Sequence, residues 1–117
     1  MKIAIVQDGP VFNDLQKTIE KTCDYISKAK EAKADLIVFG ECWLSGYPVW
    51  LDVCQDVNLW DHPPIKEVWS DTYRNSINLS NDDLSPIQKA LKDAQMFAVI
   101  GANEVQEKGK GNHTIFN

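Results

Sequence analysis

The order of apolar and polar residues along the first forty positions predicts a strand, a helix and a second strand. Residues 3–6 are all apolar, which is typical of a strand buried on both faces. From 15 to about 33, apolar residues recur every three or four positions between charged ones, so we expect an amphipathic helix capped by Asn13 or Asp14. Residues 36–39 form the second apolar run. This order predicts two parallel strands joined by a right-handed crossover.

The remainder of the chain predicts a long loop, a helix and two more strands. The pattern loosens between about 48 and 80, where we expect a loop insertion with a short helical face after Pro64. A helix should begin at Ser85, and residues 97–102 should form the third strand. Residues 113–117 resemble a fourth strand, and because the sequence stops inside it we expect the chain to be one part of a larger protein. The fold class is therefore α/β.

Composition narrows the function classes without choosing one. The 117 residues suit one small domain, and 17 acidic against 12 basic side chains give a net charge of −5, which disfavours a nucleic-acid partner. No apolar run approaches the roughly 20 residues that cross a bilayer, so we expect no membrane partner. Cys23, Cys42 and Cys54 lack metal-type or redox-type spacing, and reduced thiols in the cytoplasm are the simplest account of them.

Glu41 is the residue whose position most suggests chemistry. It follows a buried strand and Gly40, and the turn Gly46-Tyr47-Pro48 comes shortly after it. Ligands of open α/β sheets bind outside the carboxyl ends of the strands, so an acid here is placed for proton transfer. The alternative is an ordinary surface glutamate at the end of a strand.

Two neighbouring candidates are open to plainer interpretations. Cys42 adjoins Glu41, but successive side chains of an extended chain point to opposite faces, so we expect Cys42 to be a packed apolar residue. Glu104 follows the third predicted strand and is either a second acid near the same sheet edge or a polar residue at a strand end.

Several segments together resemble the N-terminal part of the nitrilase (carbon–nitrogen hydrolase) superfamily. They are Val6-Gln7, Pro10-Val11, Lys30-Glu31-Ala32, residues 34–41, Gly46-Tyr47-Pro48, residues 99–104 and residues 114–117. The Phe-x-Glu sequence followed by Gly-Tyr-Pro is the most specific of these. Gly40 departs from the proline that usually precedes the glutamate in the family. Residues 43–50 and the long loop after them are most similar to true nitrilases.

The resemblance implies an α-β-β-α sandwich, of which this chain would be the incomplete N-terminal part. It also implies a Glu-Lys-Cys catalytic set that works without metal or cofactor on a small nitrile or amide, in a protein that forms homo-oligomers at full length. By motif, Glu41 is the catalytic base and Tyr47 lines the substrate pocket. The family's lysine and cysteine fall beyond Asn117, so we expect no turnover from these 117 residues alone.

Other functions remain open from the sequence. An amidase or carbamoylase of the same superfamily would use the same Glu41. A non-catalytic α/β binding module, or a degenerate remnant, is also compatible with the pattern of elements. A binding module of that build would need a phosphate-binding glycine loop or a receiver-type aspartate, and the sequence shows neither.

Overall fold

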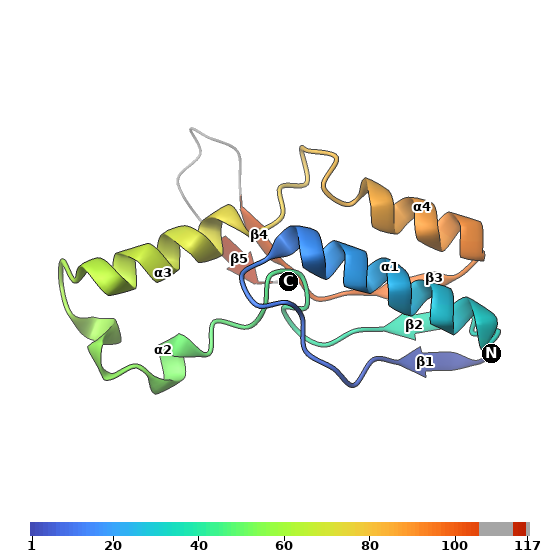
Figure 1. The fold of residues 1–117 in the computed structure, drawn as a ribbon, viewed down its shortest axis with the longest axis horizontal. Helices are drawn as coiled ribbons and strands as arrows, with labels where there is room; N and C mark the ends of the chain where they lie inside the picture. Colours follow the sequence, from blue (N-terminus) through green and yellow to red (C-terminus); the bar gives the residue numbers. More distant parts are fainter. Residues whose placement is uncertain (106–113, 117) are drawn as a thin grey trace.

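Three short parallel strands form the sheet that organises the chain. The computed structural model describes residues 1–105 and the backbone of strand β5 (Thr114–Phe116). Strands β1 (Ile3–Ile5), β2 (Leu36–Val38) and β3 (Phe97–Val99) lie in the order β1-β2-β3, with β2 in the centre (Figure 1). Both pairings are parallel, as the order of elements predicted. The chain is therefore α/β, as expected.

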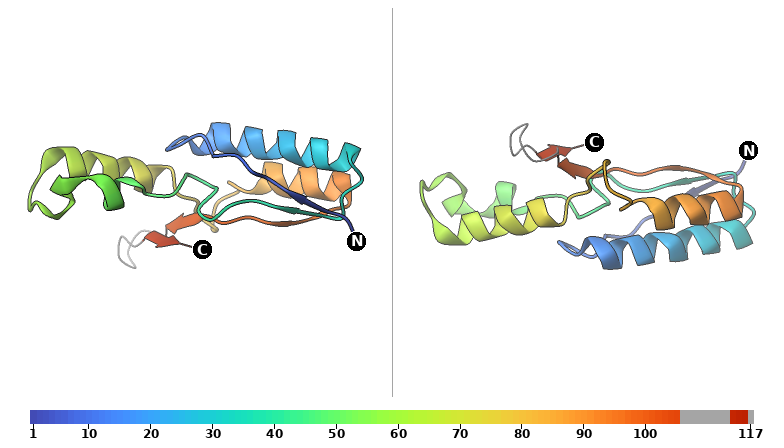
Figure 2. Two further views of the ribbon diagram at one scale, coloured as in Figure 1. Left: turned by 90° about the horizontal axis from the view of Figure 1, so that it is seen from below. Right: turned by 90° about the horizontal axis from the view of Figure 1, so that it is seen from above.

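Two helices cover the same face of this sheet. Helix α1 (Leu15–Glu31) and helix α4 (Ser85–Ala94) run side by side over it (Figure 2). Helix α1 begins as predicted, because the Asp14 carboxylate accepts a hydrogen bond from the Lys17 backbone N–H at 3.0 Å. Within residues 1–105, none of the helices combines the length and the apolar character that a bilayer span needs.

The hydrophobic core lies between the helices and the sheet. Ile37 of the central strand is almost fully buried, and the core around it includes Ile26 of α1 and Ile87 of α4. The predicted apolar face of α1 is confirmed, since its buried residues follow one another at helical spacing. The core therefore fixes β2, and with it the point at which the chain leaves the sheet.

The opposite face of the sheet is apolar and exposed. Ile5 is 72% and Phe97 80% accessible, and Ile3 and Val99 on the same face are also exposed. Figure 2 shows both helices on the other side. The prediction that residues 3–6 are buried on both faces is wrong for this chain, because Ala4 and Val6 pack against the core while their neighbours point away from it.

Residues 48–80, expected as a loop insertion with a short helical face after Pro64, are more helical than expected, and the helix predicted there is present as α3. They contain helix α2 (Trp50–Val53), the 3₁₀ helix η1 (Gln55–Asn58) and helix α3 (Pro63–Arg74), which together extend away from the sheet (Figure 1). Trp50 and Trp69 pack edge to face, with their ring centroids 4.7 Å apart. This aromatic contact joins α2 to α3 and gives the segment its own packing.

The third strand is shorter than predicted. The prediction of one strand over 97–102 is wrong, since β3 ends at Val99 and a separate strand β4 (Asn103–Val105) pairs antiparallel with β5. Between them, Ala102 forms an isolated parallel bridge with Leu44 instead of continuing beside β2. The fourth predicted strand is present at 114–116, and positions 113 and 117 lie outside the described residues.

Candidate active site

Glu41 stands just past the carboxyl end of the central strand. The backbone N–H of Phe39 still bonds to the Val99 carbonyl at 2.9 Å, which extends the pairing of β2 with β3. The chain then turns at Gly40, and Glu41 is exposed. A carboxylate at this edge of a parallel sheet lies where α/β proteins place their ligands.

The turn that follows Glu41 has an unusual backbone. Cys42, Ser45 and Gly46 have φ angles of 50°, 87° and 98°, in the left-handed region. The Gly46 N–H donates to the Cys42 carbonyl at 2.8 Å and closes the turn. The φ of Gly46 is one that favours glycine, and a Cβ atom there would also lie 2.8 Å from the Phe12 ring. Such a backbone persists only when surrounding contacts hold it.

Trp43 anchors the same turn to helix α1. Its side chain is 1% exposed, and its indole N–H donates to the Thr22 hydroxyl at 2.8 Å. The ring packs against Phe39 and Tyr25 at centroid distances of 5.0 and 6.2 Å. The indole is therefore a fixed point directly after Glu41 and Cys42.

Tyr47 lies within electrostatic reach of Glu41. Its ring is half exposed. The pKa of the Tyr47 hydroxyl is raised first by the negative charge of Asp52 and next by its hydrogen bond to that carboxylate, and the charge of Glu41 contributes further. Glu41 precedes and Tyr47 follows the turn that the Gly46 N–H closes on the Cys42 carbonyl. The sequence did not single out Asp52, although its place in the helix directly after the Gly-Tyr-Pro turn is a usable signal.

Cys42 is packed, as expected, although the chain turns here with a left-handed φ and is not the extended segment from which the expectation came. The side chain is buried while Glu41 is exposed, so the two neighbours do diverge. Burial raises the pKa of the Cys42 thiol, and the negative charge of Glu41 raises it further. A buried neutral thiol is a poor nucleophile. Cys23 on α1 is half-buried with a pKa likewise raised by burial, and Cys54 is exposed.

Alkylation with iodoacetamide should distinguish the cysteines by this burial. We expect Cys54 to react at least about tenfold faster than Cys42, because the thiolate is the reactive form and access controls its rate. Peptide mass spectrometry over a time course measures the order, and the same reaction in urea, where all three thiols are accessible, is the control. Preferential alkylation of Cys42 in the folded chain would contradict this assignment.

A cluster of charged and aromatic side chains connects Asp8, which follows β1, to helix α1 and to the Trp43 ring. The Lys21 ammonium lies 2.7 Å from the Asp8 carboxylate, and the Tyr25 hydroxyl donates to the same carboxylate at 2.6 Å. Lys21 also lies over the Trp43 ring, 5.8 Å from its centroid. The hydrogen bond from Lys21, followed by that from Tyr25, lowers the pKa of Asp8 to about 2.

This cluster predicts a specific pH dependence of stability. The folded pKa of Asp8 lies below its ordinary value of 3.8, so ionised Asp8 stabilises the fold above about pH 4 and this contribution is lost as the pH falls toward 2. Asp8→Asn should therefore lower the urea midpoint near pH 5, and the difference from the parent chain should shrink toward pH 2. A difference that is constant over this range would contradict the prediction.

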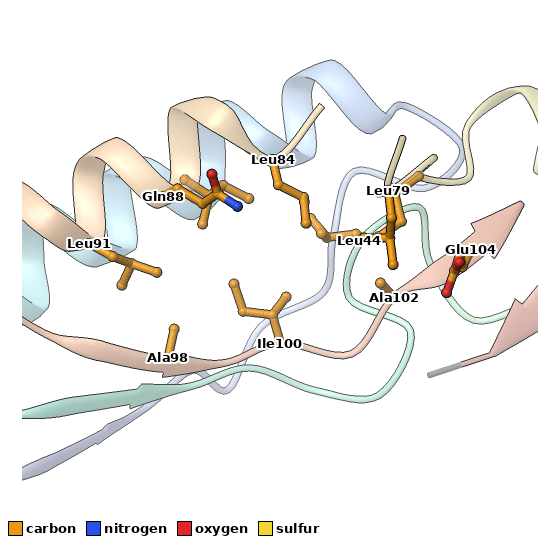
Figure 3. Close-up of a pocket in the computed structure, with 11 residues that line it drawn as sticks. Leu44, Leu79, Leu84, Gln88, Leu91, Ala98, Ile100, Ala102 and Glu104 are labelled. Atoms are coloured by element: carbon orange, nitrogen blue, oxygen red, sulfur yellow. The ribbon is translucent and has the colours of Figure 1, made fainter. Parts of the chain in front are cut away.

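Glu104, for which the sequence left a second acid near the sheet edge and a strand-end polar residue as alternatives, is the middle residue of its strand. It lies in β4 and lines an apolar pocket of about 330 Å³ between α4 and β3, together with Leu84 and Ile100 (Figure 3). The remaining polar side chain in that lining is Gln88, and Glu41 does not take part in it. Glu104 therefore contributes to a pocket in whose lining Glu41 has no part.

Two residues that contact the Glu41 turn were missed from the sequence. Gly101 and Asn103 follow β3 and lie against residues 40–46. A glycine directly after an apolar strand was the available signal for Gly101. The sequence carried no comparable signal for Asn103, because the residue that its side-chain amide bonds to is 57 positions away.

These observations define a class of protein. The chain is an α/β unit that presents an exposed acid on a firmly held turn at the carboxyl edge of its central parallel strand. Among the described residues, no three His, Cys, Asp or Glu side chains gather closely enough to hold a metal ion.

Comparison with known proteins assigns the family. The family model for carbon–nitrogen hydrolases matches residues 2–117, and the chain belongs to this family. It is 33% identical over 104 residues to an arylacetonitrilase of Aspergillus oryzae, covering 89% of this chain and 29% of that protein. It is 32% identical over 104 residues to a cyanide hydratase of Microdochium sorghi, covering 89% of this chain and 27% of that protein. The chain thus spans less than a third of the length of these relatives.

Proposed function

We propose that this chain supplies the N-terminal part, and the general base, of a hydrolase that converts a nitrile to a carboxylic acid and ammonia. The observation that carries the proposal is the placement of Glu41, exposed on a fixed turn after the central strand, in a chain of this family. The names of the relatives refer to an acetonitrile and to cyanide, which favours a nitrile over an amide as substrate.

In the proposed reaction, Glu41 removes the proton from a cysteine thiol. The thiolate sulfur bonds to the nitrile carbon, one C–N π pair moves to nitrogen, and nitrogen takes up a proton to give a thioimidate. Water adds to that carbon and ammonia leaves, which produces a thioester. A second water then releases the carboxylic acid and restores the thiol. Glu41 accepts and returns protons in these steps, and a lysine stabilises the charge that develops on nitrogen.

The cysteine and the lysine of this reaction are proposed to come from the part of the hydrolase that corresponds to the remaining length of the relatives. The three cysteines of this chain do not suit the role, since Cys42 is buried with a raised pKa and Cys23 is half-buried on α1. Cys54 is exposed on the segment that extends from the sheet. The 117 residues alone should therefore release no ammonia from a nitrile.

Tyr47 is proposed to line the substrate pocket. It is half exposed, follows the turn that begins at Glu41, and has the charge of Asp52 near its hydroxyl. Its ring offers an apolar surface with a polar end beside the base, which suits a small organic nitrile.

The exposed sheet face is proposed to pack against the second sheet of an α-β-β-α sandwich. An exposed apolar surface of this kind marks an interaction site, and Ile5 and Phe97 are its most exposed side chains. Residues 48–80 are proposed to be an insertion in this domain. At full length we expect a homo-oligomer in the cytoplasm that needs no cofactor.

A joined hydrolase tests the proposal. Residues 1–117 would replace the matching segment of the Aspergillus oryzae arylacetonitrilase, and ammonia release would be measured from phenylacetonitrile and from phenylacetamide. We expect ammonia from the nitrile with the joined protein and none with the 117 residues alone. A joined protein that folds but releases no ammonia would contradict the proposal, and preference for phenylacetamide would indicate an amidase.

A further inference from the structure

The segment after β3 lies directly against the backbone of Glu41. A Cβ atom built on Gly101 would be 2.6 Å from the Cys42 nitrogen, 2.8 Å from the Gly40 oxygen and 2.9 Å from the Glu41 Cα. All three are backbone atoms, so no flexible side chain can move aside to make room. Only glycine allows the two segments to approach this closely.

Backbone hydrogen bonds hold the same turn to the same segment. The Leu44 N–H donates to the Gly101 carbonyl at 3.0 Å, and the Asn103 N–H donates to the Leu44 carbonyl at 3.3 Å. Gly101 thus touches the backbone at Glu41, and residues 101–103 are hydrogen-bonded to Leu44, three positions later in the turn. These two hydrogen bonds fix the path of the chain after Glu41.

The side chain of Asn103 provides another anchor. It is fully buried, and its amide nitrogen donates to the Gly46 carbonyl at 2.9 Å. Its amide oxygen is buried without a hydrogen-bond partner among the described residues. A buried amide is unfavourable for stability unless hydrogen bonds satisfy it, so apolar packing does not account for asparagine here. Its bond to the turn that precedes Tyr47 does.

We propose that Gly101 is a positioning residue for Glu41, and that Asn103 fixes the other end of the same turn. Gly101 sets the distance between β3 and the backbone of the base, while Asn103 sets the direction in which the chain leaves toward Tyr47. Both residues act through the backbone of the Glu41 turn. The inference rests on the proposed role of Glu41 as general base, and it identifies what holds that base in register with the sheet.

Two alanine substitutions in the joined hydrolase form a matched test. Gly101→Ala forces the backbone of residues 40–42 to move, whereas Gly40→Ala introduces a methyl group that meets nothing within 4 Å. Displacing a catalytic group by about 1 Å can cost up to about a hundredfold in rate. We expect Gly101→Ala to lower kcat on phenylacetonitrile by at least about tenfold with KM changed less than about twofold. Gly40→Ala should keep the parent kcat.

The readouts separate positioning from a purely structural role. Rates are taken per folded enzyme, well below the unfolding temperature recorded by circular dichroism. If Gly101→Ala lowers the unfolding temperature but keeps the kcat of Gly40→Ala, the inference is overturned. If Gly101→Ala does not fold, Asn103→Ala decides, because it removes the bond to Gly46 without adding atoms: a reduced kcat supports the inference and an unchanged kcat overturns it. Glu41→Gln is measured in parallel, since an active Glu41→Gln protein would remove the proposed function itself.

Discussion

Glu41→Gln should lower the turnover of the joined hydrolase by about 10²- to 10⁴-fold, the usual contribution of a positioned general base. Glutamine has nearly the size of glutamate and can still accept hydrogen bonds, but it does not take up a proton from a thiol. The side chain is exposed, so the change leaves the core and the turn intact. Initial rates of ammonia release from phenylacetonitrile, fitted for kcat and KM, measure the effect. The loss should fall on kcat.

The control for this experiment is another exposed glutamate changed in the same way. Glu67 lies on α3, in the segment that extends from the sheet, and Glu67→Gln removes the same charge. We expect the Glu67→Gln protein to keep its kcat within about twofold, as for surface substitutions away from a site. Equal rates for the two variants would show that Glu41 is an ordinary surface acid, which is the alternative that the sequence left open.

The layout of the sheet could be predicted from the sequence because it depends on local patterns. The apolar run at 36–39 and the helical spacing after Asp14 each need only neighbouring residues to be recognised. From their order, the parallel pairing of β1 with β2 followed and is confirmed. The placement of Glu41 at the end of the central strand is a consequence of the same pattern.

The supports of Glu41 could not be predicted because they join residues far apart in the chain. Gly101 contacts the turn across 60 positions, and the predicted strand over 97–102 ends early because residues 101–103 bond to Leu44. Periodicity along one segment carries no information about such contacts. The left-handed φ angles of Cys42 and Ser45 have the same origin, since tertiary contacts hold these two residues in a backbone conformation that residues other than glycine rarely adopt.

The exposed sheet face also explains why residues 3–6 were correctly predicted as a strand but wrongly predicted to be buried on both faces. Strands covered on both faces read as continuous apolar runs, and residues 3–6 show such a run. Among the described residues, helices cover one face of the sheet, so Ile5 on the other face is left exposed. The apolar run of β1 suits a strand covered on both faces, which agrees with the second sheet proposed above.

Trp43→Ala should destabilise the 117-residue chain by about 3–5 kcal/mol, the range for truncating a large buried aromatic residue. The indole is 1% exposed and packs against Phe39 and Tyr25, so its removal leaves a cavity between the Glu41 turn and α1. Urea unfolding followed by circular dichroism at 222 nm measures the loss as a lower midpoint. The midpoint should fall while the slope of the transition stays the same.

Two further substitutions divide this effect into its parts. Trp60→Ala is the matched control, because that indole is 97% exposed and its loss should change the unfolding free energy by less than about 0.5 kcal/mol. Thr22→Val keeps the shape of its side chain but leaves the Trp43 N–H buried without an acceptor, which should cost about 1–3 kcal/mol. If Trp43→Ala and Trp60→Ala had equal midpoints, Trp43 would not be the anchor of the turn. A loss in Thr22→Val as large as in Trp43→Ala would assign the anchoring to the hydrogen bond and not to the packing of the ring.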